Sequence, residues 1–175
     1  MRSVNTRLDH AARQLYNACL GDALRRVRLL RESRAYQQAR ALPKDDPDRN
    51  RLFDAARDTH GFTDDALQAY AIKIRRQAFP GHLDARTAQK LGTRAFTAAD
   101  KYLRGRHGQP RFKGRRQLNT VEGKSNDGGI RWRTDHVEWL GLRLPAIIDP
   151  RDEVTTYALK QRVKYVRLVR RRLGS

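Results

Sequence analysis

A change of hydrophobic period at Lys101–Gln117 is the feature that most constrains the fold of this chain. Before this segment, apolar residues recur every three or four positions, which is typical of helices that bury one face. After it, short apolar runs alternate with turn residues, which is typical of hairpins. Three glycines and Pro110 disfavour a helix inside the segment. The sequence therefore predicts an α+β fold, with a helical bundle at 1–104, a basic loop at 105–117 and a small antiparallel β region at 118–175.

The first helix has the clearest pattern. Apolar residues at steps of three and four from Val4 to Leu30 predict a helix from about residue 4 to the late thirties. Gly21 lies within this helix, and we expect it to mark a close crossing with another helix. The opposite face is rich in arginine and is interpreted either as solvated or as a contact surface. Its arginines are Arg7, Arg13, Arg25, Arg26, Arg28, Arg31 and Arg34.

Three shorter helices complete the expected bundle of about four. One spans about Asp48–Thr59, after a break that contains two prolines. The next begins at Thr63 as N-cap and ends before Pro80. The last is capped by Asp84 and continues into the basic segment. Short connections between most of these helices favour an antiparallel bundle.

The C-terminal part reads as short strands. We expect strands at 118–122, 129–133, 137–140 and 142–144, with a further, strongly cationic strand over 163–173. Trp132 and Trp139 flank a turn and are expected to pair across it. Few residues remain for the last strand to turn into, which suggests that the chain is cut short.

The net charge of the chain indicates which class of binding partner to expect. Lysine and arginine exceed aspartate and glutamate by 38 to 19, giving a formal charge of +19. Nucleic acid is the first partner to expect for such a domain, and an anionic membrane surface is the second. Since no apolar run is long enough to span a bilayer, we expect no membrane partner. The single cysteine, Cys19, excludes an internal disulfide and favours a cytoplasmic protein.

Two clusters of cations are the candidate nucleic-acid-binding residues. The first is the basic segment, where Phe112 lies among the cations and is a candidate for stacking. The second is the expected last strand. A solvated linker is the alternative interpretation of the first cluster. The candidates are Lys101, Arg104, Arg106, Arg111, Phe112, Lys113, Arg115, Arg116, Lys164, Arg167, Arg170 and Arg171.

No catalytic or metal site is expected. The C-terminal carboxylates lie mostly at turns, where aspartate is favoured for local hydrogen bonding. The five histidines have no metal-binding spacing. We therefore predict a protein without a cofactor that is not itself an enzyme.

The motif GQPRFKGRR at 108–116 resembles the G-x-P-R-F-K segment of TnpB (OrfB-type) insertion-sequence proteins, which are relatives of type V CRISPR effectors. LYNACLGDALRR at 15–26 and LGTRAFTAADKY at 91–102 are similar to helices of that family. The resemblance covers roughly residues 8–172. The strand that opens such proteins, the RuvC-like nuclease and the zinc ribbon have no counterpart in this sequence.

This resemblance implies a recognition-lobe-like helical part and a partial wedge-like β part that hold nucleic acid. The expected partners are a structured guide RNA, target DNA or an RNA–DNA duplex. One alternative is a split RNA-guided endonuclease, in which a separate polypeptide supplies the nuclease domain. Another is a non-functional remnant of a transposon protein.

Overall fold

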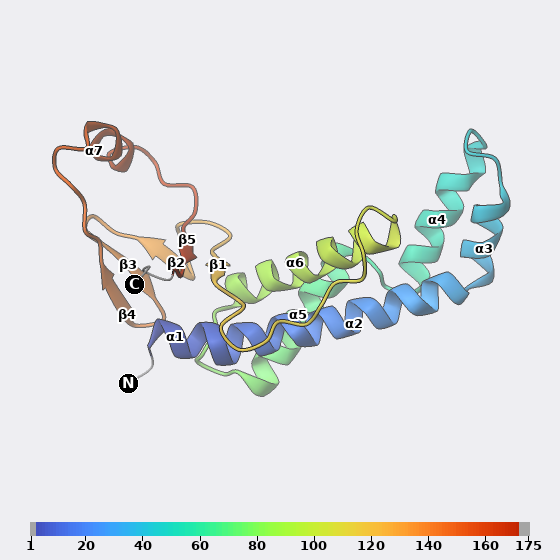
Figure 1. Cartoon of the computed structure of the whole chain (residues 1–175), viewed down its shortest axis with the longest axis horizontal. Coiled ribbons are helices and arrows are strands. Elements are labelled where there is room, and N and C mark those ends of the chain that lie inside the picture. Colours follow the sequence, from blue (N-terminus) through green and yellow to red (C-terminus); the bar gives the residue numbers. More distant parts are fainter. Residues whose placement is uncertain (1–2, 172–175) are drawn as a thin grey trace.

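In the computed structural model, which describes residues 3–171, helices make up the chain as far as Leu103 and short strands dominate after it (Figure 1). The predicted α+β class is thus confirmed. The helical elements are α1 Val4–Thr6, the π-helix η1 Arg7–Ala12, α2 Arg13–Glu32, α3 Arg34–Ala41, α4 Pro47–Thr59, α5 Asp64–Ala78, α6 Ala85–Leu103 and α7 Glu153–Leu159. The strands are β1 Thr120–Glu122, β2 Ile130–Trp132, β3 His136–Trp139, β4 Leu142–Pro145 and β5 Arg167–Val169.

The predicted first helix is interrupted at Ser33, so the expectation of one helix to the late thirties is wrong. Ser33 adopts an extended conformation with ψ 142°, which ends α2. Its hydroxyl accepts a hydrogen bond from the Tyr36 N–H at 3.3 Å and thereby caps α3. A serine that caps a new helix competes with continuation of the old one, and periodicity alone does not detect this.

A π-helical turn, η1, lies near the start of the first helix and begins at Arg7. Arg7, which the sequence assigned to the polar face, is buried with only 3% exposure. Its guanidinium donates hydrogen bonds to the carbonyl oxygens of Trp139 and Leu140 and lies over the Trp139 ring. Arg7 therefore fastens the N-terminal helix to the β region.

The helices α2, α5 and α6 pack side by side and form the body of the molecule (Figure 1). The predicted apolar face of α2 is buried, including Leu15, Cys19 and Val27. Gly92 on α6 lies against α5, where a Cβ atom would come within 2.8 Å of the Leu67 carbonyl oxygen. The close helix crossing in this bundle thus depends on Gly92.

The strands form two small antiparallel sheets, β1–β5 and β2–β3–β4. In the β2–β3 register, Trp139 lies opposite Ile130 and Trp132 lies opposite Val137. The two tryptophans are therefore not cross-strand partners, and the prediction that they pair is wrong. The predicted last strand is ordered as β5 only over 167–169, and residues 172 and 173 lie outside the described part of the chain. The helix α7 was not predicted; Asp152 caps it by accepting from the Thr155 N–H.

Asp84 joins the helical and β regions. Its carboxylate caps α6 by accepting from the Thr87 N–H at 2.8 Å and also accepts from the Trp139 Nε1–H at 3.0 Å. Leu118, Val121 and Trp139 belong to the same buried cluster as residues of α2 and α6. The helical and β regions therefore share one hydrophobic core.

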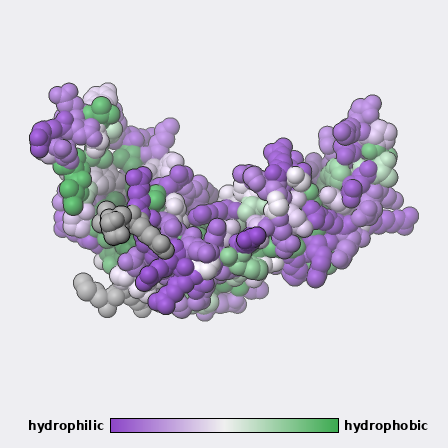
Figure 2. Space-filling model, in the orientation of Figure 1, coloured by the Kyte–Doolittle hydropathy of each residue, from purple (hydrophilic) through white to green (hydrophobic). Residues whose placement is uncertain are grey.

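The molecule has a curved outline with raised ends. The α3–α4 pair rises at one end and the sheets with α7 rise at the other, so that α6 lies between them (Figure 1). The visible surface is mostly hydrophilic (Figure 2). This concave side is where the basic loop and α6 meet.

Candidate nucleic-acid interface

The basic loop 105–117 follows the surface of α2 in an extended path (Figure 1). Asn17 on α2 fixes it with two hydrogen bonds to one backbone position. Its Nδ2 donates to the Lys113 carbonyl oxygen at 2.9 Å, and its Oδ1 accepts from the Lys113 N–H at 2.8 Å. Further along, Asp9 accepts from the Arg116 N–H at 3.2 Å. The loop is therefore held at defined points along the first helix.

Phe112 lies against α2 at Gly21 and is itself 56% exposed. A Cβ atom at Gly21 would be 3.7 Å from the Phe112 ring. The prediction that Gly21 marks a helix crossing is wrong, because its neighbour is the aromatic ring of the loop. Phe112 is therefore partly covered by α2 and partly exposed to solvent.

A cationic groove of about 660 Å³ runs between α6 and the basic loop and ends at β1. We call it the α6 groove. Its walls combine cations, threonine hydroxyls and apolar atoms. The residues that line it are Tyr16, Thr87, Lys90, Leu91, Thr93, Arg94, Thr97, Ala98, Lys101, His107, Gly108, Pro110, Lys113, Thr120, Val121, Glu122 and Arg167.

Glu122 is the acid among the residues that line the α6 groove. It forms ion pairs with Lys90 at 3.3 Å and with Arg167 at 2.8 Å. Burial raises the pKa of Glu122, but hydrogen bonds from Arg167 and Lys90 outweigh it and hold the pKa below its ordinary value. With five cations lining the groove and one carboxylate, the net charge of the walls is positive.

The structure brings some of the predicted residues to this groove. Lys101 and Lys113 line it from opposite walls, α6 and the loop. Arg106, Arg111, Arg115 and Arg116 lie on the exposed surface of the loop region. The residues that the structure describes provide no ion-pair partner for these four arginines. The side chains of these four arginines are exposed to solvent.

Three other predicted residues are ion-paired within the protein. Arg104 pairs with Asp100 at 2.8 Å, and Arg167 pairs with Glu122. Arg170 donates two hydrogen bonds to the Asp9 carboxylate, at 2.8 and 2.9 Å. These hydrogen bonds lower the pKa of Asp9 and raise that of Arg170. The Arg167–Glu122 and Arg170–Asp9 pairs join elements that are distant in sequence, whereas the Arg104–Asp100 pair lies within the end of α6.

The two remaining predicted cations, Arg171 and Lys164, line different hollows. Arg171 lines a small hollow together with Arg116 and the Asp9–Arg170 pair, so the two clusters from the sequence do meet there. Lys164 lines a separate hollow with Arg162 and Asp127. Lys164 is thus not part of the α6 groove.

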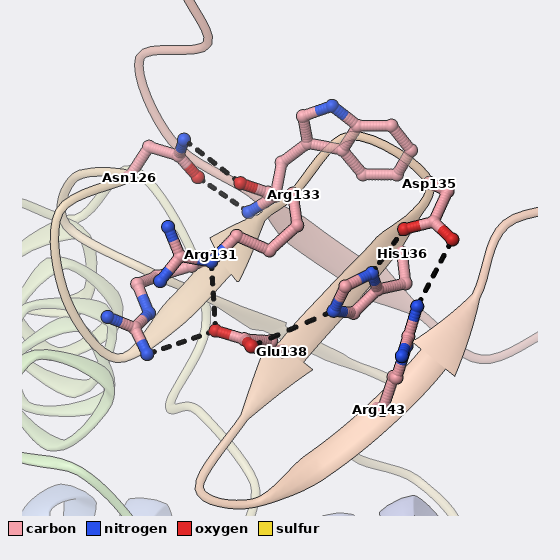
Figure 3. Close-up of polar contacts among 8 residues, drawn as sticks. Asn126, Arg131, Arg133, Asp135, His136, Glu138 and Arg143 are labelled. Carbon is pink, nitrogen blue, oxygen red and sulfur yellow. Dashed lines mark hydrogen bonds and ion pairs between the residues drawn. The ribbon is translucent and has the colours of Figure 1, made fainter.

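The exposed side of β2–β3–β4 carries a contrasting polar network, in which three arginines and a histidine contact two carboxylates (Figure 3). Glu138 accepts from Arg131 at 3.0 Å and from Arg133 at 2.9 Å. Asp135 pairs with Arg143 at 3.2 Å and also bonds His136 (Figure 3). Since these charges are compensated locally, this sheet is a weaker candidate for phosphate binding than the α6 groove.

Sequence reasoning missed Lys90, Arg94 and Asn17. Lys90, Arg94 and Lys101 lie on the groove side of α6, and their spacing of four and seven residues was a readable signal. The Arg94 guanidinium lies 5.6 Å from the Tyr16 ring and donates to the Thr120 carbonyl oxygen. Asn17 lies in the middle of a helix, where asparagine is unfavourable. Its presence there was therefore a sign that its side chain forms hydrogen bonds with another part of the chain.

Other chemistry has little support in the described part of the chain. Cys19 is buried in the core as predicted, and burial raises the pKa of its thiol to about 12. Between residues 3 and 171, no three or more histidine, cysteine or acidic side chains gather where they could hold a metal ion. Within the same range, no helix combines the length and apolar character that crossing a membrane requires.

Comparison of the chain with models of known protein families, with curated proteins and with solved structures gave no match.

Proposed function

We propose that this protein binds nucleic acid through the α6 groove and the arginines of the adjacent basic loop. The observation that carries the proposal is the groove itself, in which Lys101 and Lys113 lie on opposite walls among threonine hydroxyls. Ammonium groups and hydroxyls are the donors that proteins use to hold phosphate oxygens. The exposed arginines of the loop extend the same positive surface.

The resemblance to TnpB-like proteins agrees with this proposal, since the matching motif GQPRFKGRR lies in the loop beside the groove. On that basis, a structured RNA, a DNA target or an RNA–DNA duplex is the ligand class. The proposal concerns binding, and it assigns no reaction to the described residues.

Salt dependence of binding tests the proposal. Each phosphate contact releases a counterion, so log K falls against log salt with a slope of about −0.9 per contact on duplex DNA. If six cations of the groove and loop contact phosphates, the slope is about −5. Fluorescence anisotropy with labelled duplex DNA and labelled RNA measures it.

Lys101→Gln and Lys113→Gln remove one charge each from the groove. Each is expected to make the slope shallower by about 0.9. Arg40→Gln on α3, an exposed residue outside the groove, is the matched control and leaves the slope unchanged. A wild-type affinity that is absent, or that does not change between low and high salt, contradicts the proposal.

A further inference from the structure

Phe112 of the basic loop is held in an exposed position by α2. All five phenylalanines lie within the described part of the chain, and Phe112 alone among them is exposed, at 56%. The next residue, Lys113, has both of its backbone groups hydrogen-bonded to Asn17. Two ring atoms of Phe112 lie 3.7 and 3.9 Å from the position that a Cβ atom on Gly21 would occupy. The ring is therefore positioned before any ligand binds, which reduces the entropy cost of binding.

Two arginines of α2 continue from the place where this ring lies. Residues 21, 25 and 28 are spaced by four and three positions, so Gly21, Arg25 and Arg28 share one face of the helix. The two arginines lie about 6 Å and about 10 Å beyond Gly21 along the helix axis. Both are exposed, and together with Gln109 of the loop they line a hollow of about 550 Å³. Arg25 pairs with Asp22 at 2.8 Å, whereas Arg28 has no ion-pair partner in the described part of the chain.

An exposed aromatic ring among cations matches an unpaired nucleotide. Proteins hold single-stranded nucleic acid by stacking its bases on aromatic side chains and by placing cations along its backbone. Inside a duplex, each base is already stacked between its neighbours on the same strand, so its face is not free to contact a protein ring. The arrangement around Phe112 therefore favours a strand with unpaired bases.

We infer that an unpaired base of a single-stranded segment stacks on Phe112, while neighbouring phosphates contact Arg111 and Arg28. Both arginines are exposed, and neither has an ion-pair partner in the described part of the chain. This inference rests on the proposed function and deepens it by naming single-stranded nucleic acid as the ligand at the loop. Loops and ends of structured RNA contain such segments. Stacking tolerates any base, so it assigns no sequence preference.

Removal of the bases from the ligand tests the stacking contact. A short oligothymidylate and an abasic strand of equal length carry the same number of phosphates, so their electrostatic contacts are alike. By fluorescence anisotropy, wild type is expected to bind oligothymidylate about 5- to 150-fold more tightly than the abasic strand, as one stacked base predicts. Phe112→Leu keeps an apolar side chain over Gly21 but has no ring, and it is expected to lose most of this preference.

Two further variants control for structural effects. Tyr157→Leu removes another exposed aromatic ring, on α7, and is expected to keep the full preference for oligothymidylate. Phe112→Trp keeps a ring at the site, and its added fluorescence is expected to be quenched by oligothymidylate but not by the abasic strand. Equal binding of the two strands by wild type, an unchanged preference in Phe112→Leu, or absence of quenching in Phe112→Trp at saturation overturns the inference.

Failure of this inference is distinguishable from failure of the proposed function. On duplex DNA, Phe112→Leu is expected to bind as wild type does, whereas Lys101→Gln still makes the salt slope shallower. An equal loss on duplex and single strand means that the ring has only a structural role, and the inference is then wrong. If Lys101→Gln alters the slope while Phe112→Leu binds every strand as wild type does, the proposed function stands without it. If wild type shows no salt-dependent binding to any strand, the proposed function itself fails.

Discussion

At the scale of single residues, a few polar side chains decide where the basic loop lies. Asn17 satisfies both backbone groups of Lys113, and Asp9 joins the loop at Arg116 to the segment after β5 through Arg170. Asn17 hydrogen-bonds both the N–H and the carbonyl oxygen of Lys113, and so it fixes the loop without using a charged group. Asp9 adds an ion pair with Arg170, and the contribution of this pair to the stability of the fold depends on pH.

The Asp9–Arg170 pair predicts a pH-dependent stability. Hydrogen bonding to Arg170 lowers the pKa of Asp9 in the folded protein, so the pair stabilises the fold above the ordinary aspartate pKa of 3.8. This contribution is lost as pH falls through the folded pKa. Asp9→Asn is therefore expected to lower the free energy of unfolding by about 1 kcal/mol at pH 7 and by progressively less below pH 3.8.

Urea denaturation at a series of pH values measures this difference. Asp58→Asn, at an exposed aspartate of α4, is the control and changes stability little at any pH. A difference between wild type and Asp9→Asn that stays constant down to pH 2 means that the ion pair does not account for the effect.

At the scale of elements, two helix glycines that look alike in sequence have opposite roles. At Gly92, an added Cβ atom would approach the Leu67 carbonyl oxygen at 2.8 Å and the Ala71 Cβ at 3.2 Å. At Gly21, the nearest atom is 3.7 Å away on the Phe112 ring, which is ordinary van der Waals contact. Packing therefore requires glycine at position 92 and tolerates alanine at position 21.

Alanine substitution distinguishes the two positions. Gly92→Ala is expected to destabilise the fold by about 1–3 kcal/mol, because α5 and α6 must separate. Gly21→Ala is expected to stabilise it by up to about 1 kcal/mol, because alanine favours the helix. Each variant serves as the control for the other in thermal or urea unfolding. Equal effects of the same sign contradict this account of the bundle.

Sequence periodicity predicted the helices in which buried residues recur at a regular spacing. It missed features that depend on local or tertiary hydrogen bonds. The apolar face from Leu8 to Leu30 is buried as expected, and Thr63 and Asp84 cap their helices. Ser33, by contrast, ends a helix through its own hydroxyl. Trp139 lies opposite Ile130, and Asp84 and Arg7 bind its indole N–H and its carbonyl oxygen. Contacts of this kind join residues too far apart in sequence to be read from spacing.

The candidate site shows the same division. The cationic character of Lys101 and Lys113 followed from the sequence, as did the exposure of the loop arginines. The pairing of Arg170 with Asp9 joins residues 161 positions apart. Such a pair exists only once the helical and β regions share a core. Sequence therefore predicted which residues are cationic but not which of those charges are already neutralised.

At the scale of the whole molecule, charge is distributed unevenly despite the net +19. The arginines on the exposed side of β2–β3–β4 are ion-paired, Glu122 of β1 pairs with Lys90 of α6 and Arg167 of β5, and Arg170 after β5 pairs with Asp9 of η1. Arginines without an ion-pair partner among the described residues lie along the basic loop beside the α6 groove, although exposed cations such as Arg40 on α3 also lie elsewhere. A polyanion that neutralises this region would bind along the loop, between the raised ends of the molecule (Figure 1).

Hydrogen–deuterium exchange with and without duplex DNA at low salt measures directly where the nucleic acid lies. The account predicts slower exchange of backbone amides over 105–112 in the complex and unchanged exchange over α4, Pro47–Thr59. Unchanged exchange over 105–112 while anisotropy reports saturated binding would contradict it.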